Sequence, residues 1–198
     1  MTTRISKIHR KTKETDIDIK LNLDGKGKID VSVTISFLEH MLSLFGKHGL
    51  FDLEIKATGD TQIDNHHLIE DMGITLGQAI KECLQDKKGI TRYGFSSVPM
   101  DDSLVECSID ISGRPYLVYN MSTDKQNILE EKEKYELYKH FFYSLVCNAD
   151  MTLHLNLKYG ENLHHNLEAA FKAFGRALKQ AVSINPLTDE IPSTKGCI

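Results

Sequence analysis

The stretch Asp64-Asn65-His66-His67-Leu68-Ile69-Glu70-Asp71 places two adjacent histidines ahead of a glutamate and opens a run of apolar residues at helical spacing. On a helix that turns by about 100° per residue, His66, His67 and Glu70 share one face. The two imidazoles still diverge by about 100°. The stretch therefore predicts the first turn of a helix with a metal-binding face, and it leaves open whether both histidines bind one ion.

The same spacing returns in Gly160-Glu161-Asn162-Leu163-His164-His165-Asn166-Leu167-Glu168. An offset of 98 residues (164 minus 66) superposes three pairs of side chains: His66 on His164, His67 on His165, and Glu70 on Glu168. An internal repeat of this kind indicates a duplicated structural unit. We predict two structural repeats, residues 1–91 and 92–184, in one compact domain, followed by a C-terminal tail, 185–198, that closes the site.

Hydrophobic patterns predict the order of elements within each half. Residues 17–23 and 29–35 alternate apolar and polar side chains around Asp24-Gly25, which predicts a hairpin with one buried face. Helical and strand patterns follow in the first half at 37–47, 51–58 and 66–84, and in the second at 104–111, 116–121, 138–147, 151–158 and 164–182. The unit is β-β-α-β-α, used twice. Two sheets, each with one face to bury, predict an α+β fold with the helices packed between them.

Two local features qualify this pattern. Gly73 and Gly77 lie four residues apart in the long first-half helix, a spacing that lets another helix approach closely. The polar run 122–136 interrupts the second half, and we predict a solvated loop or a short exposed helix there.

Composition narrows the class of protein. The 198 residues are 40% hydrophobic and 26% charged, values that are ordinary for a globular protein, and the net charge is −4. Neither a nucleic-acid partner nor a membrane is indicated by this charge, and no apolar run approaches the roughly 18 residues of a membrane span. The four cysteines form no C-x-x-C pair, which predicts reduced thiols and a cytoplasmic location.

Two further histidines extend the metal-binding set. His40 lies 26 residues before His66, and His140 lies 24 residues before His164. The candidate ligands are then six histidines and two glutamates: His40, His66, His67, Glu70, His140, His164, His165 and Glu168. If each adjacent pair splits between two ions, each ion receives three imidazoles and one carboxylate and keeps positions open for substrate.

The alternative is that each half binds its own ion through its own His-His-x-x-Glu. Such ligands suit zinc, iron or nickel as well as manganese. We interpret the remaining histidines, His9, His48 and His154, as structural.

From about Arg10 to Gly196, the chain resembles the imidazoleglycerol-phosphate dehydratase family of histidine biosynthesis. The resemblance rests on Asp64–Asp71 and on the motifs Ser112-Gly113-Arg114-Pro115, Asn162-Leu163-His164-His165, Glu168-Ala169-Ala170-Phe171-Lys172-Ala173 and Pro192-Ser193-Thr194-Lys195-Gly196. It implies a duplicated unit like domain 2 of ribosomal protein S5, with the helices packed between two four-stranded sheets. The same resemblance implies two Mn²⁺ per chain and a homo-oligomer of 24 subunits with sites shared between neighbours. It also implies a reaction, the dehydration of D-erythro-imidazoleglycerol phosphate to 3-(imidazol-4-yl)-2-oxopropyl phosphate.

A phosphorylated substrate requires cations near the ligands. Lys172 falls about 80° from His164 on the helical wheel, on the ligand face and about 6 Å beyond Glu168, which suits a phosphate anchor. The resemblance adds four more phosphate-binding residues: Arg92, Arg114, Ser193 and Lys195. Arginine suits phosphate because its planar fork donates two hydrogen bonds at once.

For catalysis, the expected path binds the substrate ring as an imidazolate, expels hydroxide to give a diazafulvene, and then loses a proton. Glu70 and Glu168 are candidate bases if the metal does not engage them fully. Glu14 is a third candidate, because it matches a family site residue that another subunit contributes. The sequence does not choose among the three.

Two departures from the family pattern concern His40. Glu39 stands where the family usually has aspartate, and we expect the longer carboxylate to alter how His40 is oriented. The family's Thr-Gly just upstream is also missing, because the chain reads Val33-Thr34-Ile35-Ser36.

Two rival functions remain. One is a di-metal phosphoesterase, although such sites usually use several aspartate ligands and this set has none. The other is a structural oligomer held together by metal, for which a set of phosphate-binding cations has no use.

Overall fold

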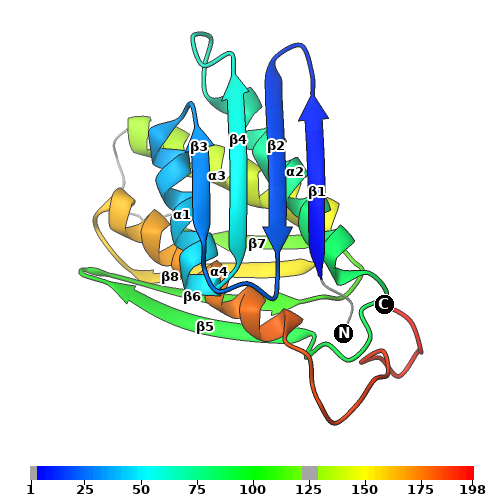
Figure 1. The fold of residues 1–198 in the computed structure, drawn as a ribbon. Helices are drawn as coiled ribbons and strands as arrows, with labels where there is room; N and C mark the ends of the chain where they lie inside the picture. Colours follow the sequence, from blue (N-terminus) through cyan, green and yellow to red (C-terminus); the bar gives the residue numbers. More distant parts are fainter. Residues whose placement is uncertain (1–3, 122–128) are drawn as a thin grey trace.

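Each half of the chain folds into three strands, a helix, a fourth strand and a second helix (Figure 1). The computed structural model describes residues 4–121 and 129–198. The first half contains β1 (Ile5–Lys11), β2 (Thr15–Asn22), β3 (Ile29–Val33), α1 (Ser36–Gly49), β4 (Asp52–Gly59) and α2 (His66–Leu84). The second half contains β5 (Tyr93–Met100), β6 (Ser103–Asp110), β7 (Tyr116–Asn120), α3 (Leu129–Ala149), β8 (Thr152–Tyr159) and α4 (Leu163–Val182).

The predicted β-β-α-β-α unit is present in both halves, each time with one more strand in front of it. These two strands, β1 and β5, escaped the sequence pattern because their buried positions are small or polar. Ser6 is the buried residue of β1, and Gly94 and Ser96 are those of β5. A side chain at Gly94 would collide with the Ala177 carbonyl of α4, so close packing on α4 requires glycine there.

The predicted hairpin between β2 and β3 is wrong. The sheet order is β1-β2-β4-β3, so β4 lies between β2 and β3. β2 pairs antiparallel with both β1 and β4, whereas β3 pairs parallel with β4 through the crossover helix α1. The second sheet repeats this order as β5-β6-β8-β7. Alternation of apolar residues identifies the buried face of a strand, but it does not identify the neighbouring strand.

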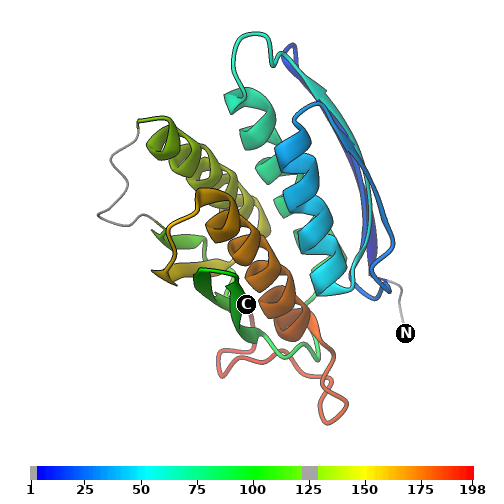
Figure 2. The same cartoon turned by 90° about the vertical axis from the view of Figure 1, so that its left-hand side faces the viewer.

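The helices lie between the two sheets, as predicted (Figure 2). α1 and α2 cover the first sheet, α3 and α4 cover the second, and the two layers meet where α2 packs on α3 and α1 packs on α4. A Cβ on Gly73 or Gly77 would collide with the carbonyl oxygens of Phe141 or Leu145 in α3. The close approach predicted at Gly73 and Gly77 is therefore confirmed. Gly175 of α4 meets Phe45 of α1 in the same way, at a crossing that was not predicted.

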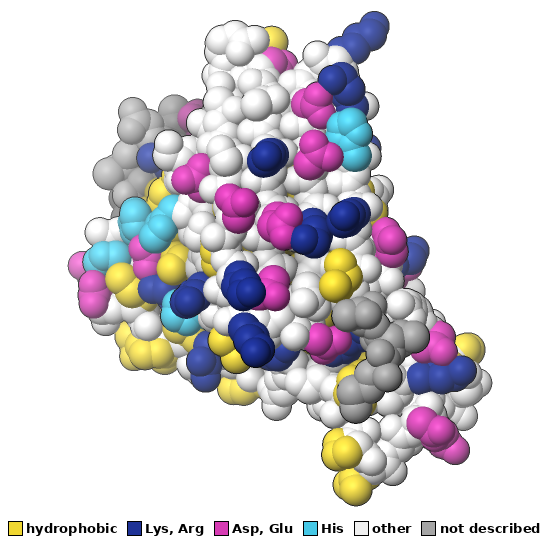
Figure 3. Space-filling model, in the orientation of Figure 1, with side chains coloured by type: hydrophobic (Ala, Val, Ile, Leu, Met, Phe, Trp, Pro, Cys, Tyr) yellow, Lys and Arg dark blue, Asp and Glu magenta, His cyan; other side chains and the backbone are white. Residues whose placement is uncertain are grey.

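The outer face of the first sheet is covered by charged side chains of both signs (Figure 3). Its pairs include Lys20 with Glu54 and Lys11 with Asp16. In residues 4–121 and 129–198, none of the helices is both long and apolar enough to cross a membrane.

The second half differs from prediction in one helix. α3 begins at Leu129, well before the predicted residue 138, so the end of the polar run is helical. Residues 122–128 of that run lie outside the described part of the chain. The predicted division between residues 91 and 92 falls in the connection between α2 and β5.

Candidate functional site

Both histidine pairs are set in place by a side chain two residues ahead of them. The Asp64 carboxylate accepts a hydrogen bond from the backbone N–H of His66 at 2.7 Å, and the Asn162 side chain accepts from His164 at 2.9 Å. Such oxygens satisfy N–H groups that the first turn of a helix leaves without partners. The rings within each pair are 6.3 Å apart and almost perpendicular, so the two imidazoles diverge as predicted.

One cluster forms around Glu168 of α4. His40 Nε2 and His164 Nε2 lie 2.8 Å and 2.9 Å from Glu168 Oε1. These three residues, the Glu168 cluster, have ligand atoms within 4.8 Å of one another, a spacing that suits a bound ion. His40 belongs to the first half of the chain and the other two to the second, because α1 packs on α4. The cluster is therefore assembled from both repeats.

The repeat generates a second cluster around Glu70. His66 Nε2 lies 3.2 Å from Glu70 Oε2, and the rings of His66 and His140 are 5.1 Å apart between centroids. We call these three residues the Glu70 cluster, and His140 lies beside the other two because α3 packs on α2. Its ligand atoms do not all lie within 4.8 Å of one another, so the Glu70 cluster is more open than the Glu168 cluster. The structure thus brings six of the eight predicted ligands into two sets of three.

The other two histidines point away from these clusters. His67 Nδ1 lies 3.1 Å from Asp60, and His165 Nδ1 lies 2.5 Å from Asp102. The hydrogen bond with Asp60 raises the pKa of His67, and that with Asp102 raises the pKa of His165. A carboxylate at Nδ1 orients the ring and leaves Nε2 to bind a metal. Asp60 and Asp102 were not among the predicted site residues, because they lie in loops at no fixed spacing from the histidines.

Glu168 is held in its ionised form. Burial opposes the charge, but hydrogen bonds from Lys172, His40 and His164 outweigh it and lower the pKa of Glu168 to about 2. Its side chain is only 9% exposed. A carboxylate that stays ionised among imidazoles suits a divalent transition metal, and this donor set does not by itself distinguish manganese from its neighbours.

Lys172 lies on the ligand face of α4, as predicted. Its Nζ is 2.6 Å from Glu168 Oε2, and its side chain is 13% exposed. Within this chain, Lys172 therefore contacts the carboxylate of the Glu168 cluster. Its role as a phosphate anchor stays a prediction.

The four other predicted phosphate-binding residues come together elsewhere. Arg92, Arg114, Ser193 and Lys195 line a cavity of about 250 Å³, which we call the phosphate pocket after the ligand predicted for these residues. Arg92 helps to build it, because its guanidinium donates to Asp110 at 2.7 Å and to the carbonyl of Pro192 at 2.8 Å. The second bond fastens the C-terminal tail beside β5.

The phosphate pocket is far from the histidines of the same chain. The backbone of Arg92 is bonded to Ala181 near the end of α4, whereas His164 lies in the first turn of α4. About 17 residues of helix separate the two positions, or roughly 26 Å along the axis. One chain therefore does not bring its own phosphate pocket to its own predicted metal ligands.

Two glutamates near the clusters behave differently. Glu14 Oε2 lies 3.8 Å from His67 Nδ1, and Glu14, Asp60 and His67 form a further group able to hold a cation. Glu39 instead accepts a hydrogen bond from the backbone N–H of Val33 at 3.0 Å. The expectation that Glu39 orients His40 is not supported, because this bond ties Glu39 to β3 while His40 sits in its cluster.

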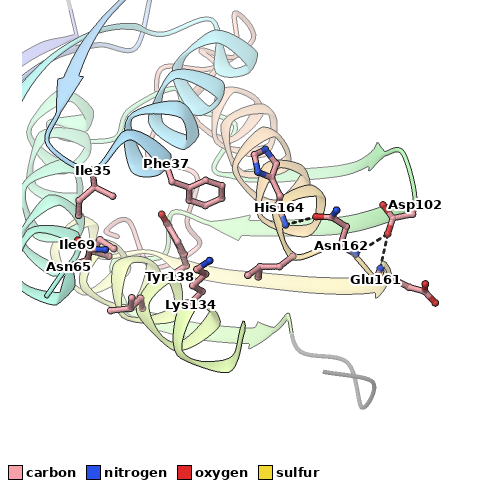
Figure 4. A pocket seen from close by; sticks show the side chains of 12 residues that line it. Ile35, Phe37, Asn65, Ile69, Asp102, Lys134, Tyr138, Glu161, Asn162 and His164 are labelled. Carbon is pink, nitrogen blue, oxygen red and sulfur yellow. Dashed lines mark hydrogen bonds between the residues drawn. The ribbon is translucent and has the colours of Figure 1, made fainter. Parts of the chain in front are cut away.

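A cleft of about 900 Å³ opens beside His164, at the N-terminal ends of α1, α2 and α4 (Figure 4). Phe37 and Tyr138 contribute aromatic walls, and the ring of Phe37 contacts that of His164 at 5.2 Å.

Among the histidines interpreted as structural, His9 lies outside both clusters and pairs with Asp16 at 2.8 Å.

Known proteins resemble this chain in both sequence and fold. Residues 33–178 match the family described as imidazoleglycerol-phosphate dehydratase. The imidazoleglycerol-phosphate dehydratase of Geobacter metallireducens is 50% identical over 98% of each chain, and that of Clostridium botulinum strain Langeland is 48% identical over the full length of both.

Two crystal structures extend the likeness to the fold. That of imidazoleglycerol-phosphate dehydratase from Staphylococcus aureus has a TM-score of 0.78 and 39% identity, and covers 91% of this chain and 99% of its own. The enzyme from Pyrococcus furiosus, solved in complex with (S)-C348, has a TM-score of 0.78 and 36% identity, with 96% and 100% covered.

Proposed function

The chain belongs to the imidazoleglycerol-phosphate dehydratase family, hydro-lyases of histidine biosynthesis, and from this premise we propose that it carries out the dehydration with two Mn²⁺ per chain. The observation that carries the proposal is the pair of clusters, each built from both repeats. The product is 3-(imidazol-4-yl)-2-oxopropyl phosphate.

One ion is assigned to the Glu168 cluster and the other to the Glu70 cluster. Each cluster offers two imidazoles and one carboxylate, and His67 and His165 supply the remaining imidazoles from neighbouring subunits. This assignment follows from their direction, since each points away from the clusters of its own chain with Nδ1 on a carboxylate. When bound, manganese supplies positive charge that stabilises the anionic form of the substrate's imidazole ring.

Shared sites also explain the position of the phosphate pocket. Roughly 26 Å separates it from the histidines of the same chain, far more than the three-carbon chain of the substrate spans. A neighbouring subunit must therefore bring its phosphate pocket to these ligands. We take the homo-oligomer to be the 24-mer implied by the family, in the cytoplasm.

Among the three carboxylates, Glu14 is the best placed to accept the proton. Glu168 has both oxygens occupied, Oε1 by two histidines and Oε2 by Lys172, and Glu70 is paired with His66. The Glu14 side chain is 53% exposed and lies at the edge of this region beside His67. It is thus free to take the proton lost after hydroxide departs and the diazafulvene forms.

The decisive experiment is to incubate the purified, manganese-loaded protein with D-erythro-imidazoleglycerol phosphate and to follow the ketone product. We expect turnover that chelation abolishes and manganese restores, with two Mn²⁺ per chain by elemental analysis. Turnover that survives complete removal of metal would refute the metal dependence. One Mn²⁺ per chain at full loading would refute the two-cluster assignment.

A further inference from the structure

A buried carboxylate next to the Glu70 cluster is used by none of the steps above. Asp71 follows Glu70 on α2 but points toward the first sheet, where it is only 8% exposed. Its Oδ1 accepts from Arg10 Nε at 2.9 Å and forms an ion pair with Arg10 Nη2 at 2.8 Å, and its Oδ2 accepts from the Thr15 hydroxyl at 2.6 Å. Arg10 and Thr15 lie on the two strands that flank the β1–β2 turn.

The hydrogen bonds continue from Asp71 into this turn. The Thr15 hydroxyl has one proton, which it gives to Asp71, so at the 3.1 Å contact between the two threonine hydroxyls Thr12 is the donor. The Thr12 hydroxyl also accepts from the backbone N–H groups of Glu14 and Thr15, each at 3.0 Å. Asp71 thereby fixes the backbone that carries Glu14.

The same turn reaches His67 by a second route. The carbonyl of Glu14 accepts from the backbone N–H of Asp60 at 3.0 Å, and the carboxylate of Asp60 lies against His67. The Glu14 side chain is itself mostly exposed, and within residues 4–121 and 129–198 its one ionic contact is the 3.8 Å approach to His67. Its position is therefore set by the backbone of the turn.

We propose that Asp71 is a positioning residue that holds the Glu14 carboxylate at the catalytic site through Thr15 and Thr12. The inference rests on the proposed function. Catalytic groups displaced by about 1 Å lose on the order of 10²-fold in rate, so a turn that carries a catalytic carboxylate needs such an anchor. The second repeat has no counterpart, because Ala169 occupies the position equivalent to Asp71 (71 plus 98).

The test is a double-mutant cycle on kcat. We expect Asp71→Asn to lower kcat by about 10- to 100-fold with little change in KM and with two Mn²⁺ retained. If Asp71 acts through Glu14, the same substitution made in Glu14→Gln should lower kcat by less than about 2-fold. Multiplied losses in the double variant, or loss of manganese from Asp71→Asn, would overturn the proposal.

A second readout does not depend on turnover. Hydrogen exchange of the backbone amides of Glu14 and Thr15 should accelerate in Asp71→Asn, because the Thr12 hydroxyl that accepts from them loses its anchor. Asp24→Asn is the matched control. It removes the carboxylate partner of Arg4 at the opposite end of β1 and β2, and it should change neither kcat nor exchange in the turn. Unchanged exchange in Asp71→Asn would contradict the proposal.

Thr15→Val guards against misfolding of Asp71→Asn, because it keeps the ion pair with Arg10 and removes only the link to the turn. It should reproduce the loss of kcat and its disappearance in Glu14→Gln. A wild-type kcat in Thr15→Val would refute the proposed route. Failure of the wild-type protein to dehydrate the substrate would instead refute the proposed function, and the exchange experiment would still decide whether Asp71 orders the turn.

Discussion

The Glu168 and Glu70 clusters descend from the same repeat, yet their surroundings differ. Glu168 is 9% exposed and bonded to Lys172, whereas Glu70 is 43% exposed and the position equivalent to Lys172 (172 minus 98) is Ile74. Conversely, Asp71 and its contacts with the first sheet belong to the first repeat alone. The duplication preserved the predicted ligand residues, while burial and charge around them diverged.

Removing single histidines should have the largest effect on the two clusters. His66→Ala and His67→Ala should deplete different metal positions, because His66 faces the Glu70 cluster and His67 faces away from it. Both variants should nearly abolish dehydration. Anomalous-scattering occupancies of the two positions provide the measurement, with His154→Ala as a control that loses neither ion. Loss at one common position would favour the alternative in which each half binds its own ion.

Substitution of Lys172 tests the role of the positive charge that the Glu168 cluster has and the Glu70 cluster lacks. Lys172→Ala should lower kcat/KM on the order of 10²-fold, since charge-assisted hydrogen bonds contribute about 1.5–3 kcal/mol, and should retain the metal. Steady-state kinetics and metal analysis measure both. Lys158→Ala, which removes a surface lysine paired with Glu106, is the control. Loss of metal with an unchanged KM would show that Lys172 only supports Glu168.

The pH dependence of stability tests the burial of Glu168. Its pKa is lowered from 4.5 to about 2 in the folded, metal-free chain. The carboxylate therefore contributes on the order of 3 kcal/mol above pH 4.5, and this is lost as the pH falls toward 2. The difference in unfolding free energy between wild type and Glu168→Gln should shrink over that range. A difference that stays constant between pH 4.5 and 2 would contradict this account of the Glu168 carboxylate.

Removing the carboxylates that contact Nδ1 of His67 and His165 should weaken metal binding to a similar, smaller extent. Asp60→Asn and Asp102→Asn each remove the group that orients a ring through Nδ1. We expect metal affinity to fall by about 10- to 100-fold in each, as is typical for such partners, and competition with a chelator measures it. Unchanged affinity in both variants would mean that the rings keep their orientation without these carboxylates.

The sequence by itself determined the local features of this protein. The spacing of His66, His67 and Glu70 predicted the start and the divergent face of α2, and the same spacing at His164 predicted α4 and the duplication. Gly73 and Gly77 predicted a close helix crossing. These features follow from the geometry of one helix, which depends on residues only three or four positions apart.

Only the tertiary structure decided which segments meet. It placed β4 between β2 and β3, joined His40 to Glu168 through the packing of α1 on α4, and set Asp60 behind His67. It also placed the phosphate pocket at the far end of α4 from His164. Contacts between distant segments depend on how whole helices and sheets pack, and no spacing along the chain records that packing.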